Sequence, residues 1–156
     1  MREYQRTTRE CSFSDFTPEV RSAIRKYAEK HALGNIESEA LMCAETVSEK
    51  IKTGFFSKIF GGSNYAQNVS MLVTPARLLW CALDSRVNAV VLSARLSEIE
   101  ISDFASDLIQ DNGLDVFGFI NQSPERVQAF IGLGAEAAAQ KFREAVKEAA
   151  GRAKSG

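Results

Sequence analysis

The sequence predicts an α+β fold in which a bent β-sheet or partly open barrel is capped by a C-terminal helix and preceded by an N-terminal helical hairpin. Three observations support this prediction. Apolar residues recur at helical spacing before residue 52, alternate at strand spacing from residue 65 to residue 133, and return to helical spacing up to Ala150. The chain of 156 residues is long enough for one domain with a sizeable core and a short appendage.

The N-terminal part is interpreted as an arm followed by two helices. Residues 1–13 are polar and lack a clear period, which indicates a mobile arm; the alternative is an edge strand added to a partner's sheet. Thr17 and Pro18 suit the N-cap and the first position of a helix. A second helix is expected from Asn35, because apolar residues then repeat at intervals of three and four. The expected divisions are an arm (1–13), a helical extension (14–52), a barrel domain (53–150) and a tail (151–156).

Alternating or buried apolar segments predict six or so strands. Trp80 and Cys81 fall on opposite faces of one strand, so either both faces of the sheet are covered or one is an interaction surface. Gly118, inside its strand, permits a bend, and residues 102–113 suggest a short helical turn. Phe142 is the bulky residue on the apolar face of the final helix. The expected strand segments are 65–74, 76–84, 87–96, 97–102, 114–120 and 126–133.

The most suggestive local signal is a run of lysines and phenylalanines without an acidic residue, KIKTGFFSKIF. One interpretation is a first strand and its turn, with the phenylalanines in the core. The other is a binding segment that inserts its rings into an anionic membrane interface or grips a partner protein. The candidate binding residues are Lys50, Lys52, Phe55, Phe56, Lys58 and Phe60.

No catalytic constellation, cofactor motif or metal-ligand spacing is found, so no catalytic, cofactor-binding or metal-ligating residue is assigned and no enzyme is expected. His31, the only histidine, is expected at a helix end as a surface or half-buried group. Three aspartates between residues 103 and 111 lack the alternation and the glutamate of a calcium-binding loop. The odd number of cysteines, Cys11, Cys43 and Cys81, predicts free thiols in a reducing compartment.

Three segments resemble bacterial pleckstrin-homology-like and GRAM-like domains. MLVTPARLLWCAL resembles one of their hairpins, with Arg77 and Leu78 matching its Arg-Leu pair. LSARLSEIEISDF resembles the strand that follows, and VQAFIGLGAEAAAQKFREAVKEA resembles the final strand, the turn and the helix that plugs the open end. The resemblance spans about residues 55–150 and implies this barrel fold there.

The resemblance implies binding and not catalysis. Eukaryotic domains of this kind often bind phosphoinositides through a basic loop; the matching residues 57–64 contain only Lys58 as a basic residue. The segment Tyr65–Gly134 has four arginines against eight acidic residues, which departs from the phosphoinositide pattern. Bacterial relatives resemble scaffolds that assemble through exposed strand edges, which implies oligomers.

We therefore expect a non-enzymatic interaction or scaffold module that binds a protein partner or itself. The alternative is a peripheral membrane or lipid-binding domain that uses Lys50–Phe60, and a small-ligand carrier or enzyme with a pocket near Trp80 ranks third. The net charge of −1 argues against a nucleic-acid partner. Without a signal-peptide pattern or a long apolar window, the protein is expected in the cytoplasm or peripherally at the inner membrane face.

The membrane alternative predicts that the wild type co-sediments with anionic liposomes. Phe55→Asp and Phe60→Asp should each abolish co-sedimentation, because a carboxylate replaces a ring at the apolar interface. Neutral liposomes are the control. A wild type that stays in the supernatant with anionic vesicles contradicts this alternative.

Overall fold

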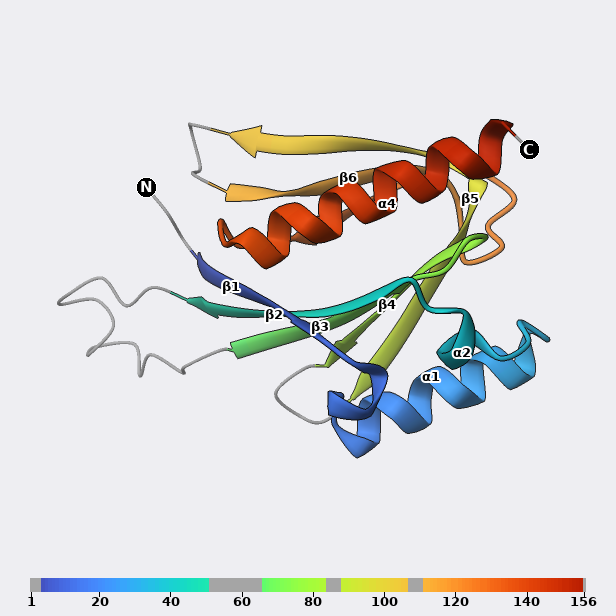
Figure 1. Cartoon of the computed structure of the whole chain (residues 1–156), viewed down its shortest axis with the longest axis horizontal. Coiled ribbons are helices and arrows are strands. Elements are labelled where there is room, and N and C mark those ends of the chain that lie inside the picture. The colour runs from blue at the N-terminus through green and yellow to red at the C-terminus, as the bar shows by residue number, and fades with distance from the viewer. Residues whose placement is uncertain (1–3, 51–65, 84–87, 107–110, 156) are drawn as a thin grey trace, which may run out of the picture.

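The computed structural model of the protein describes residues 4–50, 66–83, 88–106 and 111–155. Seven strands of this part form one antiparallel sheet, in which each strand pairs with its neighbours along the chain. The sheet curls around the C-terminal helix, and the first helix covers its other face (Figure 1). The strands are β1 (Tyr4–Cys11), β2 (Met42–Lys50), β3 (Ala66–Val73), β4 (Arg77–Leu83), β5 (Ala89–Ser106), β6 (Asp111–Ile120) and β7 (Val127–Gly132). The helices are η1 (Phe13–Asp15), α1 (Pro18–Lys30), α2 (Ile36–Glu39) and α4 (Ala137–Ser155).

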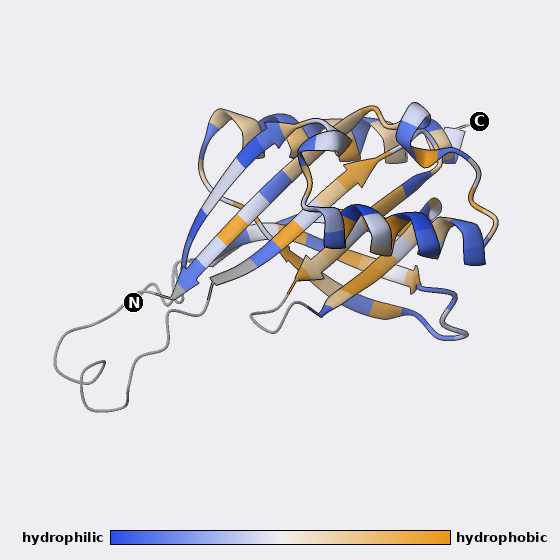
Figure 2. Cartoon of the chain, turned by 90° about the horizontal axis from the view of Figure 1, so that it is seen from below, coloured by the Kyte–Doolittle hydropathy of each residue, from blue (hydrophilic) through white to orange (hydrophobic). Residues whose placement is uncertain are grey.

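Each face of the sheet has its own core. Trp80 belongs to the core between the concave face and α4, whereas Cys81 belongs to the core between the convex face and α1. The side of α1 that faces away from the sheet is largely hydrophilic (Figure 2). Trp80 is buried, and both faces of its strand are covered, which is the first of the two alternatives expected for this strand.

The sheet bends in the middle of β5. Ala94 pairs with Ile120 and Ile99 pairs with Gly118, so four residues of β5 lie opposite a single residue of β6. Gly118 has φ of +147°, and a Cβ there would lie 2.3 Å from the Glu98 carbonyl oxygen. Glycine is thus required by both conformation and space, and the bend expected at this glycine is confirmed.

The edge strands β1 and β7 are joined at one end by side-chain contacts. The Gly134 N–H donates to Oγ1 of Thr8 over 2.8 Å, and the Thr8 N–H donates to the Glu136 carboxylate over 3.1 Å. The Arg6 guanidinium carbon lies 5.6 Å from the centroid of the Phe130 ring. The sheet is therefore a curled half-barrel, whose two edges are bridged at this end without a shared ladder.

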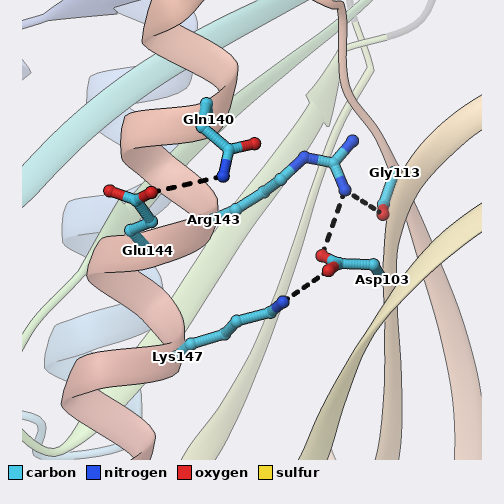
Figure 3. A network of polar contacts seen from close by, with 6 residues as sticks. All are labelled: Asp103, Gly113, Gln140, Arg143, Glu144 and Lys147. Carbon is cyan, nitrogen blue, oxygen red and sulfur yellow. Dashed lines mark hydrogen bonds and ion pairs between the residues drawn. The ribbon is translucent and has the colours of Figure 1, made fainter.

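Helix α4 is held by an apolar anchor and a polar network. Phe142 is fully buried in the concave core, as expected. On the α4 surface, Arg143 and Lys147 donate to the Asp103 carboxylate over 3.2 and 2.5 Å, and Arg143 also donates to the Gly113 carbonyl over 3.0 Å (Figure 3). These two cations lower the pKa of Asp103, Lys147 most strongly. The network ties α4 to the β5–β6 hairpin.

Two expectations for the N-terminal part are wrong. The expected arm contains β1, an edge strand of the protein's own sheet. Helix α2 has only four residues, and Met42–Lys50 is a strand where a second helix was expected, so the helical hairpin does not form. Because the sheet is covered on both faces, apolar residues on both sides of β2 are buried, and a strand buried on both sides does not show clean alternation.

The expectation of a short helical turn at residues 102–113 is also wrong for residues 102–106 and 111–113, which the structure describes as strand. Strand β5 continues to Ser106, and Ser102 already pairs with Asp115 of β6. Ladder pairing with a distant segment therefore outweighs the local helix-capping signal. The first strand and its turn, one interpretation of residues 50–64, fall almost entirely outside the described residues.

None of the helices in the described ranges is long and apolar enough to cross a membrane.

We predict that Phe142→Ala lowers the free energy of unfolding by about 3–5 kcal/mol, because it removes a fully buried ring from the concave core. Urea denaturation followed by circular dichroism measures the change. Phe117→Ala is the control: this ring is 41% exposed, so a loss below about 1 kcal/mol is expected. Similar losses for the two variants would contradict the assignment of α4 as the core of the half-barrel.

Candidate functional site

Nearly all the candidate binding residues of the lysine–phenylalanine run lie outside the residues that the structure describes. Lys52, Phe55, Phe56, Lys58 and Phe60 belong to the undescribed range 51–65, and only the backbone of Lys50, at the end of β2, is described.

The described residues enclose a polar pocket of about 230 Å³ beside the bend of the sheet. It lies between the C-terminal end of α1, the beginning of β4, the middle of β5 and the turn that follows β6. We call it the arginine pocket. Its lining residues are Tyr27, His31, Leu33, Arg77, Ser93, Ala94, Arg95, Glu98, Phe119 and Gln122.

Helix α1 contributes the two ring side chains of the arginine pocket. Tyr27 and His31 are one turn apart, and their ring centroids are 4.3 Å from each other. The helix begins with the capping contact expected from the sequence, in which the Thr17 side chain accepts from the Val20 N–H. His31 is the half-buried C-cap residue, which confirms the placement expected for it.

Hydrogen bonds hold α1 to the sheet at the base of the pocket. The Tyr27 hydroxyl lies 2.7 Å from the Ser93 hydroxyl and donates to Oδ1 of Asn121 over 2.6 Å. The Asn121 N–H donates to the Ser93 carbonyl over 2.7 Å. Asn121 and Gln122 both have positive φ, of 56° and 61°, as do the two central residues of a type I′ turn, and the Ser123 N–H donates to the Ile120 carbonyl over 3.0 Å. The turn places Gln122 at the rim.

Arg77 is positioned by a tight turn between β3 and β4. Oγ1 of Thr74 accepts from the N–H groups of Ala76 and Arg77 over 3.2 and 3.0 Å. The Thr74 N–H donates in turn to the Arg77 carbonyl over 2.9 Å. The buried threonine therefore fixes the backbone from which the arginine side chain extends.

The two arginines of the pocket are cross-strand neighbours. Arg77 of β4 pairs directly with Arg95 of β5, so both side chains leave the same face of the sheet. Within the described part of the chain, the Arg77 side chain has no hydrogen bond or ion pair. Arg95 has one weak contact, 3.9 Å from the Glu98 carboxylate, with both side chains largely exposed. Directly opposed like charges destabilise a sheet, and an anion between them relieves the repulsion.

The pocket chemistry suits the binding of an anion. Two guanidinium groups, an imidazole and an amide surround the space, whereas Glu98 supplies its single carboxylate. Guanidinium groups recognise carboxylate and phosphate by paired hydrogen bonds. The Ser93 hydroxyl and the Tyr27 phenol bond to each other and not to a base, so neither is arranged as an activated nucleophile.

The three cysteines lie away from this pocket and are poorly suited to nucleophilic chemistry. Burial raises the pKa of Cys43 and of Cys81 to about 11. Burial, reinforced by the nearby charge of Glu45, raises the pKa of Cys11 to about 12. Because the thiolate is the reactive form, all three are held in an inert state at neutral pH. Cys43 is buried in the core between α1 and the convex face of the sheet.

No family model, no curated protein and no solved structure matches this chain. The fold defines the class of the protein: an α+β protein whose seven described strands form a curled antiparallel half-barrel around a C-terminal helix.

The sequence contained part of the signal for the arginine pocket. Arg77 enters the sequence analysis only through the resemblance to a hairpin and not as a binding residue, although Thr74, three residues earlier, binds its backbone N–H. Arg95 and Tyr27 were missed. Arg95 becomes a partner of Arg77 only through the β4–β5 register, and Tyr27 lines the pocket only because α1 packs on the sheet.

The raised pKa values predict that iodoacetamide alkylates the native protein slowly. At pH about 8, Cys43 and Cys81 should react on the order of a hundredfold slower than an unperturbed cysteine, and Cys11 on the order of a thousandfold slower, because their thiolate fractions are lower. Mass spectrometry of digested protein measures the rate at each cysteine. In concentrated urea all three should reach the ordinary rate, and a fast thiol in the native protein would contradict the burial described here.

Proposed function

We propose that the protein is a non-enzymatic interaction module of pleckstrin-homology-like type that binds a partner protein by holding an acidic group in the arginine pocket. The observation that carries the proposal is the direct pairing of Arg77 with Arg95 beside a cavity, where the only carboxylate contact of the pair in the described residues is the weak one of Arg95 with Glu98. This arrangement costs stability in the free protein, and a bound carboxylate or phosphate compensates for that cost.

The type of module is supported by the order of its elements. An antiparallel meander that bends in β5 and ends in a helix inside its concave face agrees with the barrel-and-helix order implied by the resemblance. The non-enzymatic character is supported by the raised pKa values of the buried thiols of Cys43 and Cys81. It is also supported by the hydrogen bond that joins the Ser93 and Tyr27 hydroxyls to each other. A second copy of the chain is the alternative partner, and light scattering distinguishes the two cases.

The membrane alternative depends on the segment Lys50–Phe60, and no observation on the described residues favours it over the arginine pocket.

The pocket proposal predicts saturable binding of small anions. Titration with acetate and with inorganic phosphate, at ionic strength held constant with sodium chloride, should shift the NMR signals of Tyr27, Ser93 and the two arginine side chains. The double variant Arg77→Gln/Arg95→Gln should lose these shifts, because it removes both guanidinium donors.

The matched control is Arg25→Gln/Arg152→Gln, which removes two positive charges outside the pocket while leaving both of its arginines. It should retain the wild-type shifts. If wild type and the pocket variant respond alike, the arginine pocket is not an anion site and the proposed function fails.

A further inference from the structure

We infer that the acidic group in the arginine pocket belongs to an extended peptide segment of a partner protein, which crosses the bend of β5 into a second, adjoining hollow. This inference rests on the proposed function, because the arginine pocket would bind the first part of the longer peptide ligand.

The second hollow begins where the arginine pocket ends. It has a volume of about 350 Å³ and shares two wall residues, Glu98 and Phe119, with the arginine pocket. We call it the bulge groove, because it follows the irregular part of β5. Besides these two shared residues, its lining includes Ser97, Glu100, Phe117, Arg126 and Lys154.

The bulge groove combines an apolar surface with positive charge. Phe117 is a large apolar side chain that remains 41% exposed, and it lies beside Phe119 along β6. The Arg126 guanidinium carbon is 5.8 Å from the centroid of the Phe119 ring, so this cation is held over an aromatic face at the groove wall. Lys154, from the last turn of α4, supplies a second cation. The groove therefore suits an apolar side chain with an acidic residue nearby.

The backbone between the two sites favours an extended peptide over a compact small molecule. Ser97 and Glu98 have no register partner in β4 or in β6, since pairing with β4 ends at Arg95 and pairing with β6 resumes at Ile99. Both residues are exposed. On the β6 side the Glu98 carbonyl lies against Gly118, whereas on the β4 side the backbone beyond Arg95 has no ladder partner. An extended backbone that is open on one side is the kind of surface on which a peptide adds as a short strand.

The charges along this path match an acidic segment. Four cationic side chains, Arg77, Arg95, Arg126 and Lys154, line the two hollows, against the carboxylates of Glu98 and Glu100. The whole chain, in contrast, has a net charge of −1. Locally complementary charge gives an interface its specificity and orients its partner. The fitting ligand is an extended segment with an acidic residue, a large apolar residue and a further acidic residue.

In the test, a display library of random dodecapeptides is selected for binding to the full-length chain. Peptides that also bind the variant Arg77→Gln/Arg95→Gln are removed by counter-selection. Peptides that combine acidic residues with a large apolar residue should be enriched. One enriched peptide, labelled with fluorescein, is then measured by anisotropy. Phe117→Ser and Arg126→Gln should each weaken its binding about tenfold, the loss expected when one anchoring contact is removed.

The controls remove equivalent groups outside both hollows. Phe130→Ser is matched to Phe117→Ser, because Phe130 is also an exposed ring of the same hairpin, at 40%. Arg152→Gln is matched to Arg126→Gln. Both control variants should bind the peptide like the wild type, and thermal unfolding verifies that every variant is folded.

Two results would overturn the inference. If enriched peptides lose affinity in the arginine-pocket variant but not in the two groove variants, the ligand ends in the first pocket, and the proposed function survives without its extension. If no peptide is enriched over the counter-selection, a peptide ligand is excluded, while the NMR titration with acetate and phosphate decides separately whether the pocket binds anions.

Discussion

The bend in β5 is the constraint on which the rest of the structure depends. Four residues of this strand face one residue of β6, and the close approach of Glu98 to Gly118 leaves no space for a side chain at residue 118. Because of this bend, one continuous meander wraps around α4 and buries Phe142. The same irregularity removes strand partners from Ser97 and Glu98, and the two hollows lie on either side of it.

The two helices have different roles in this frame. Helix α4 fills the concave face and is tied to the β5–β6 hairpin through Asp103, which keeps the bent strands in place (Figure 3). Helix α1 covers the convex face, and through Tyr27 it is bonded to Ser93 and to the turn after β6. A helix packed against the convex core therefore also forms one wall of the arginine pocket.

Much of the fold was predictable because its signals are local. The turn around Pro75, the hairpin from Leu114 to Leu133 and the final helix depend on residues close together in sequence, and all three were identified. Strands β1 and β2 were missed for opposite reasons. A polar edge strand has no apolar pattern of its own, and a strand that is buried on both faces imitates the spacing of a helix.

The sequence by itself determined the α+β class, the bend at Gly118, the cap at Thr17 and the anchoring role of Phe142. Each of these follows from backbone conformation or from periodicity within one segment. Only the tertiary structure decided where charge accumulates. The segment Tyr65–Gly134 has more acidic than basic residues, yet Arg77, Arg95 and Arg126 all line the hollows beside the bend. Strand register and helix packing bring these residues together, and neither is encoded at a fixed spacing along the chain.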